Sequence, residues 1–166
     1  MTKWMRRLFV MLVLGTLAPW QIGATMANGQ HVDITSEGPD GLPGIFWLIK
    51  QEDMAGMAAW IAAGGDIEAR GYHGASPALA ASAIDNWPAV LWLLENGARP
   101  QAADGRGYTL AFLATRSRVA PDGRYGEALA KVRAILAEVG LLERILEPAT
   151  VKRMKAEGRW PPPGYR

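Results

Sequence analysis

The chain has 166 residues, 49% of them hydrophobic and 20% charged, which is a size and composition typical of one globular domain. It contains no cysteine, which excludes disulfides, a lipid-modified cysteine anchor and thiol chemistry. The net charge of +2 includes Lys3, Arg6 and Arg7, and from Asn28 onward 15 basic side chains face 16 acidic ones. The composition therefore gives no reason to expect nucleic-acid binding.

Residues 1–27 have the pattern of a cleavable secretory signal peptide. A short basic start is followed by an apolar run from Leu8 to Leu17 and by small residues around Ala27. Pro19 interrupts the segment, and the run is shorter than the roughly 20 apolar residues that a membrane-spanning helix needs. We expect cleavage after Ala27 or Ala24, export by the general secretory route, and a periplasmic or secreted protein with no membrane attachment afterwards.

The chain matches itself when it is shifted by 33 residues. The matching pairs are Gly64 with Gly97, Ile61 with Leu94, Trp60 with Leu93, Gly74 with Gly107, Ser76 with Thr109, Leu79 with Phe112 and Ala81 with Ala114. A glycine-bearing turn and two short helices within this period resemble the ankyrin repeat, whose signature is T-P-L-H-x-A. Segments 76–81 (SPALAA) and 109–114 (TLAFLA) carry that resemblance, and 60–69 and 93–102 are similar to the L-L-x-x-G-A-D-V-N-A ending of the family.

The resemblance to the ankyrin family implies an all-α fold, an ankyrin-like helical solenoid of about three helix-turn-helix repeats with a C-terminal helical cap. We expect a flexible lead-in at 28–38 and an ankyrin-repeat domain at 39–158, with units at 39–70, 71–103 and 104–147, a cap at 148–158 and a proline-rich tail at 159–166. The first unit has a degenerate start, as a terminal capping repeat would.

The residue types of the middle unit have clear structural roles. Ser76 is suited to cap a first helix while Pro77 takes the first helical position, and Asn86 with Pro88 repeats that arrangement for a second helix. Gly97 can end the second helix in the left-handed conformation that glycine adopts at low cost.

The apolar positions predict a buried stripe. Val90, Leu93 and Leu94 recur at helical spacing, and Trp60 and Trp92 fall on the same stripe of their helices. We expect Trp47 and Trp87 to be packing residues as well. The histidine of the family motif is replaced by Leu79 and Phe112, so we expect apolar contacts, rather than side-chain hydrogen bonds, to hold adjacent turns.

The third unit departs from the 33-residue spacing. Gly140 lies 43 residues after Gly97, which indicates an insertion at about 118–126 between its two helices, with the second helix resuming near Glu127. We then expect short helices at 141–147 and 149–157. The tail at 160–166 should be polyproline that either lies across the last helices or serves as a ligand for a partner.

The sequence contains no recognisable catalytic constellation. Its two histidines, His31 and His73, belong to the lead-in and to a turn, and no metal-ligand spacing or phosphate-binding glycine loop accompanies them. Asp85 and Glu95 lie at helix ends, where capping explains acidic residues. We therefore expect no enzymatic activity, no metal and no cofactor.

A binding surface remains as the basis for function. In the ankyrin family the turn tips and the exposed side of each first helix form a concave protein-binding face. Carried over to this sequence, with the insertion added, the expected contact residues are Asp40, Lys50, Tyr72, His73, Ile84, Arg106, Tyr108, Arg116, Arg124 and Tyr125. Tyrosine and arginine are enriched among interface hot spots, which favours this set.

We thus predict a non-catalytic protein-binding module of the periplasm that is monomeric on its own. Most specifically, it would be an immunity or inhibitor protein that neutralises a secreted effector or toxin; the alternative is an envelope scaffold or accessory factor that supports a resident enzyme under stress. Residues 28–104 carry 3 basic and 10 acidic side chains, whereas 105–166 carry 12 and 6, a division that could steer a charged protein partner.

Overall fold

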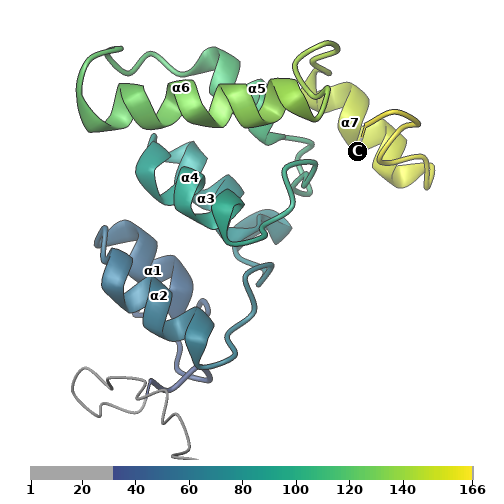
Figure 1. Ribbon diagram of the computed structural model, residues 1–166. Helices are drawn as coiled ribbons and strands as arrows, with labels where there is room; N and C mark the ends of the chain where they lie inside the picture. The colour runs from purple at the N-terminus through teal and green to yellow at the C-terminus, as the bar shows by residue number, and fades with distance from the viewer. Residues whose placement is uncertain (1–31, 166) are drawn as a thin grey trace, which may run out of the picture. The chain divides into compact units, whose positions relative to one another are not determined.

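The computed structural model describes residues 32–165, in which the fold is all-α, as expected. The predicted signal peptide, the first part of the lead-in and His31 lie outside this range. Within it the structure has seven α-helices, one short 3₁₀ turn and no strand beyond isolated bridges. The elements are α1 (Gly44–Lys50), α2 (Met54–Ala62), η1 (Tyr72–Gly74), α3 (Pro77–Ala83), α4 (Trp87–Glu95), α5 (Leu110–Arg116), α6 (Gly123–Glu138) and α7 (Pro148–Ala156) (Figure 1).

The first six α-helices form three consecutive pairs. Within the pairs, α1 packs against α2, α3 against α4 and α5 against α6. Between neighbouring pairs, α1 contacts α3, α3 contacts α5, and α4 contacts α6. From Val32 to Tyr165, no helix has the length and apolar character required to cross a bilayer.

The caps of the middle pair are those that the sequence predicts. The Ser76 hydroxyl accepts a hydrogen bond from the backbone N–H of Leu79, and the Asn86 side chain accepts one from the N–H of Ala89. The Asn86 amide also donates to the carbonyl of Ile49 at 3.0 Å. Asn86 is buried, so one side chain both begins α4 and ties the second helix pair to the first.

The backbone repeats with the period of the sequence. Glu52 and Asp85, which are 33 residues apart, both have a φ of 56° in the turn between the two helices of their pair. Gly64 and Gly97, which follow the second helix, have φ values of 92° and 95°. Because glycine reaches this left-handed region without a Cβ penalty, its recurrence marks the same helix ending in both pairs.

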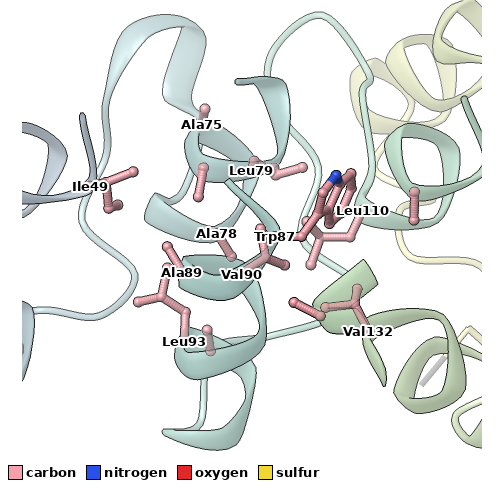
Figure 2. Close-up of a cluster of buried hydrophobic side chains, with 14 of the residues drawn as sticks. Ile49, Ala75, Ala78, Leu79, Trp87, Ala89, Val90, Leu93, Leu110 and Val132 are labelled. Atoms are coloured by element: carbon pink, nitrogen blue, oxygen red, sulfur yellow. The ribbon is translucent and has the colours of Figure 1, made fainter. Parts of the chain in front are cut away.

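The core lies at the contacts between helices and between pairs (Figure 2). Trp87, Leu93, Leu110 and Val132 are fully buried there, together with Ile49 from the first pair. Ala78 and Ala81 are also inaccessible, and their small side chains let neighbouring helices approach closely.

The prediction that four tryptophans pack in the core is confirmed for some of them and not for others. Trp60 and Trp87 are buried as expected, and Trp92 is half-buried. The expectation for Trp47 is wrong, because its side chain is 36% exposed. It points to the opposite side of α1 from the buried Ile45 and Ile49, since two helical residues advance by about 200°.

The third pair corrects two further expectations. The second helix begins at Gly123 rather than near Glu127, so the end of the predicted insertion is helical. Gly126 packs so close to the carbonyls of Ala120 and Pro121 that a Cβ would lie 2.2 Å from either oxygen. The absence of a side chain at this position therefore lets the preceding loop pack against the first turn of α6.

Residues 141–144 form a turn and a bend, and 145–147 have no regular structure, so the predicted short helix is absent. Gly140 takes a φ of 74°, and Glu147 is extended because it precedes Pro148. The helix expected at 149–157 is present as α7.

The C-terminal tail packs onto the folded chain. Tyr165 is 5% exposed and belongs to the core cluster, and its ring lies edge-to-face against Trp160 with centroids 5.0 Å apart. The N–H of Tyr165 donates to the carbonyl of Pro162, so a turn interrupts the expected polyproline conformation. The burial of Tyr165 favours a packing role over an extended ligand.

Shortening Leu93 tests the importance of the core between the pairs. We expect Leu93→Ala to lower the free energy of unfolding by about 2 to 5 kcal/mol, because a fully buried leucine leaves a cavity when it is truncated. Urea denaturation followed by circular dichroism measures this change. Leu91→Ala, in the same helix but only half-buried, is the matched control and should cost clearly less; equal costs would contradict this packing.

Candidate functional site

A groove of about 550 Å³ lies over the first helices of the three pairs. Six of the ten predicted contact residues line it: Lys50, Tyr72, His73, Ile84, Arg106 and Tyr108. They come from the end of α1, from η1, from the end of α3 and from the turn before α5. The fold therefore brings residues that are up to 58 positions apart in the sequence to one surface.

The floor of the groove is apolar. Phe46 and Ile49 of α1 and Leu79 of α3 are buried beneath it, and Leu113 of α5 closes its far side. Ala80 and Ala83 line the groove from α3, and their short side chains leave space where larger residues would fill it. The hollow thus follows from small residues on the middle first helix.

Two apolar side chains stand exposed at the rim. Tyr72 is 60% exposed and Ile84 is 56% exposed, and both line the groove. Large apolar groups held in water are a recognised feature of interaction sites. The Tyr72 hydroxyl donates to the carbonyl of Asp40 at 3.2 Å, so the ring is oriented although it is accessible.

Adjacent turn tips are joined by hydrogen bonds. Besides the bond from Tyr72 to Asp40, the N–H of Gly105 donates to the carbonyl of His73 at 2.7 Å. His73 has a φ of 56°, which turns the chain sharply at the tip of η1. The expectation that apolar contacts, rather than side-chain hydrogen bonds, hold adjacent turns is therefore incomplete. The Tyr72 hydroxyl links one pair of turns and a backbone hydrogen bond links the next.

Each cation at the groove has a carboxylate partner. Lys50 forms an ion pair with Asp40, and this hydrogen bond holds the pKa of the Asp40 carboxyl below its usual value of 3.8. The Arg106 Nε donates to Asp104 Oδ2 at 2.9 Å. The other oxygen of the buried Asp104 accepts from the backbone N–H groups of Arg106 and Tyr108, so Asp104 fixes the turn that presents both side chains.

A row of two aromatic rings in edge-to-face contact, with an arginine at each end, continues from the groove along α5. The Arg106 guanidinium lies 5.0 Å from the Tyr108 ring centroid, Tyr108 lies 5.7 Å from Phe112, and the Arg116 guanidinium lies 5.2 Å from Phe112. Arg116 also pairs with Glu147 at the surface. The sequence analysis missed Phe112 and Asp104. The four-residue spacing of Phe112 and Arg116, which are both on α5, is the signal that could have found Phe112.

Arg124 and Tyr125 lie apart from the groove lining and contact Glu52. The Arg124 guanidinium pairs with one oxygen of Glu52, and the Tyr125 hydroxyl donates to the other. The bond to Glu52 raises the pKa of Tyr125. These two predicted contact residues therefore connect the start of α6 to the turn between α1 and α2.

Comparisons with known proteins do not assign this chain to a family. No model of a protein family matches the chain, and neither curated proteins nor solved structures give a match. The side chains described between Val32 and Tyr165 include no group of three or more histidines and carboxylates arranged to hold a metal ion. The function is therefore inferred from the groove itself.

The Asp40 carboxyl offers a direct test of the groove's electrostatics. A folded-state pKa below 3.8 means that the ion pair contributes stability above that pH and loses it as the pH falls through the folded pKa. We expect Lys50→Met to raise the pKa of Asp40 toward 3.8, as measured by a carboxyl-carbon NMR titration. Arg99→Met, which breaks the separate pair with Glu68, is the control and should leave Asp40 unchanged; an identical Asp40 pKa in all three proteins would refute the pairing.

Proposed function

We propose that this chain is a non-catalytic protein-binding module, an ankyrin-like helical solenoid that holds its partner in the groove over α1, α3 and α5. The observation that carries the proposal is the convergence of Lys50, Tyr72, His73, Ile84, Arg106 and Tyr108 on that one groove. The ankyrin resemblance selected these positions from the sequence, and they line a common hollow.

The repeating backbone supports the solenoid assignment. Three helix pairs follow one another along the chain, and neighbouring pairs contact each other through their first helices. The positive φ values at Glu52 and Asp85, and at Gly64 and Gly97, recur at the 33-residue interval of the sequence. A repeat of this length is the period of the ankyrin family.

The side chains at the groove are suited to contact a protein. Tyr72, Arg106 and Tyr108 belong to the residue types that dominate binding energy at interfaces. Tyr72 is oriented by its bond to Asp40, and Arg106 is held between Asp104 and the Tyr108 ring. Because these side chains are already ordered, less conformational entropy is lost when a partner binds.

The specific role that we favour is that of an immunity or inhibitor protein for a secreted effector or toxin in the periplasm. Support comes from the predicted signal peptide at 1–27 and from the uneven charge. The described residues before Gly105 carry 3 basic and 10 acidic side chains, whereas those from Gly105 to Tyr165 carry 11 and 6. A chain with this division of charge can accelerate encounter with a charged partner and align it.

Removing two groove side chains tests the site. We expect Tyr72→Ala combined with Arg106→Ala to weaken binding to the partner by more than about 2 kcal/mol, because hot-spot tyrosine and arginine lose contacts that water cannot replace. The candidate partner is the product of the gene next to the one that encodes this chain, and isothermal titration calorimetry against that purified product measures the affinity. Circular dichroism checks that folding is retained.

The pair Arg124 and Tyr125 supplies a matched control. It has the same residue types and a similar stacking, with the guanidinium 4.8 Å from the ring centroid, but it lies outside the groove lining. Arg124→Ala combined with Tyr125→Ala should leave the affinity unchanged. If this variant loses binding and the groove variant retains it, the contact surface is the 118–126 segment instead.

Coexpression distinguishes the two roles. An immunity protein should restore growth to cells that export the neighbouring gene product, and the groove variant should fail to do so. Deletion that causes a stress defect in cells with no toxin would favour the alternative, an envelope scaffold or accessory factor for a resident enzyme.

A further inference from the structure

A second, smaller pocket of about 310 Å³ lies between the helix pairs and the C-terminal tail. The polar and aromatic side chains that line it are Arg70, Arg99, Gln101, Lys155 and Trp160, and we refer to it as the Arg70–Lys155 pocket. It shares no lining residue with the groove. Its polar walls come from the ends of the first and second repeats, from α7 and from the tail, so only the folded chain assembles it.

The charge of this pocket is not balanced by its own lining. Three of the lining side chains are cationic and none is acidic. Arg99 is compensated, because its guanidinium and its backbone N–H both donate to Glu68. Arg70 and Lys155 have no carboxylate within 4.0 Å among residues 32–165, in contrast to the cations of the groove.

Backbone carbonyls hold both uncompensated cations in place. The Lys155 Nζ donates to the carbonyls of Ala103 and Asp104, at 2.8 Å each, and the Arg70 Nη1 donates to the carbonyl of Gly74 at 3.3 Å. A carbonyl orients a cation without cancelling its charge. Lys155 retains one further N–H donor and Arg70 retains four, so both can still bind an anion. Concave walls that carry a single sign of charge raise the local concentration of counter-ions.

Trp160 supplies an apolar wall beside these charges. Its ring packs edge-to-face against Tyr165, which is almost completely buried, and this contact fixes the orientation of the indole. Trp160 remains half-buried and lines the pocket. A flat aromatic surface next to cations suits a ligand that joins an anion to a ring or to another apolar group.

We propose that the Arg70–Lys155 pocket binds a small phosphate monoester whose ester group rests on Trp160. Two uncompensated cations match the near-double charge of a phosphate monoester, and the guanidinium fork complements phosphate oxygens. The volume of about 310 Å³ has room for a phosphate with one small ring. This site goes beyond the protein-binding function proposed for the groove and does not depend on it.

Calorimetry with three probes tests the chemistry. Phenyl phosphate should bind to the purified protein more tightly than inorganic phosphate, because the ring adds contact with Trp160. Phenol, which lacks the anion, should bind much more weakly than either. The affinity for phenyl phosphate should fall as the salt concentration rises, since salt screens the attraction. No binding at millimolar phenyl phosphate overturns the proposal.

Substitutions then locate the site. Arg70→Gln should weaken phenyl phosphate binding by at least about tenfold, because a charge-assisted contact is lost. Arg118→Gln removes the same charge at an exposed position outside the pocket lining and should leave binding unchanged. Trp160→Leu should reduce the preference for phenyl phosphate over inorganic phosphate even if it lowers stability. Equal affinities of the Arg70→Gln variant and the unaltered protein would place the anion elsewhere and refute the pocket.

Vesicles identify the source of the ester. Phosphatidic acid carries a phosphate monoester as its headgroup. If the protein binds phosphatidylcholine vesicles that contain phosphatidic acid, and Arg70→Gln abolishes this binding, the ligand is a lipid. If the protein binds phenyl phosphate but not these vesicles, the ligand is a soluble phosphate ester. Both outcomes support the site and differ only in the origin of its ligand.

Discussion

Neighbouring helix pairs bury apolar side chains against each other, and the rest of the structure depends on this burial. Trp87 and Leu93 of the middle pair are fully buried, as are Ile49 before them and Leu110 and Val132 after them. Without cysteine, no disulfide can replace this contact. The burial of these side chains therefore depends on the contact between one pair and the next.

The same stacking creates the groove. Helices α1, α3 and α5 lie at successive positions and contact one another, so their exposed sides form a continuous surface. Small residues on α3, namely Ala80 and Ala83, keep that surface hollow. The turn tips stay aligned because His73 and Gly105 are joined through their backbones. The packing that holds the fold together is thus also what places Tyr72 and Tyr108 on a common rim.

The groove and the Arg70–Lys155 pocket differ in how their cations are compensated. In the groove, Lys50 and Arg106 are paired with Asp40 and Asp104, and the exposed side chains beside them are aromatic and apolar. In the Arg70–Lys155 pocket, the side chains of Arg70 and Lys155 donate, among residues 32–165, only to backbone carbonyls, so their positive charges are not cancelled by a carboxylate. This difference is the reason for proposing a protein partner for the groove and a small anion for the pocket.

The sequence by itself determined the middle helix pair, its caps and its ending. Ser76 and Asn86 act on backbone groups three residues away, and Gly97 acts through its own φ, so local chemistry was sufficient. Only the tertiary structure decided the exposure of Trp47, the start of α6 at Gly123 and the pairing of Arg124 and Tyr125 with Glu52. The Arg70–Lys155 pocket likewise joins residues 85 positions apart. Such features depend on which surfaces meet after folding, and no periodicity or short motif encodes that.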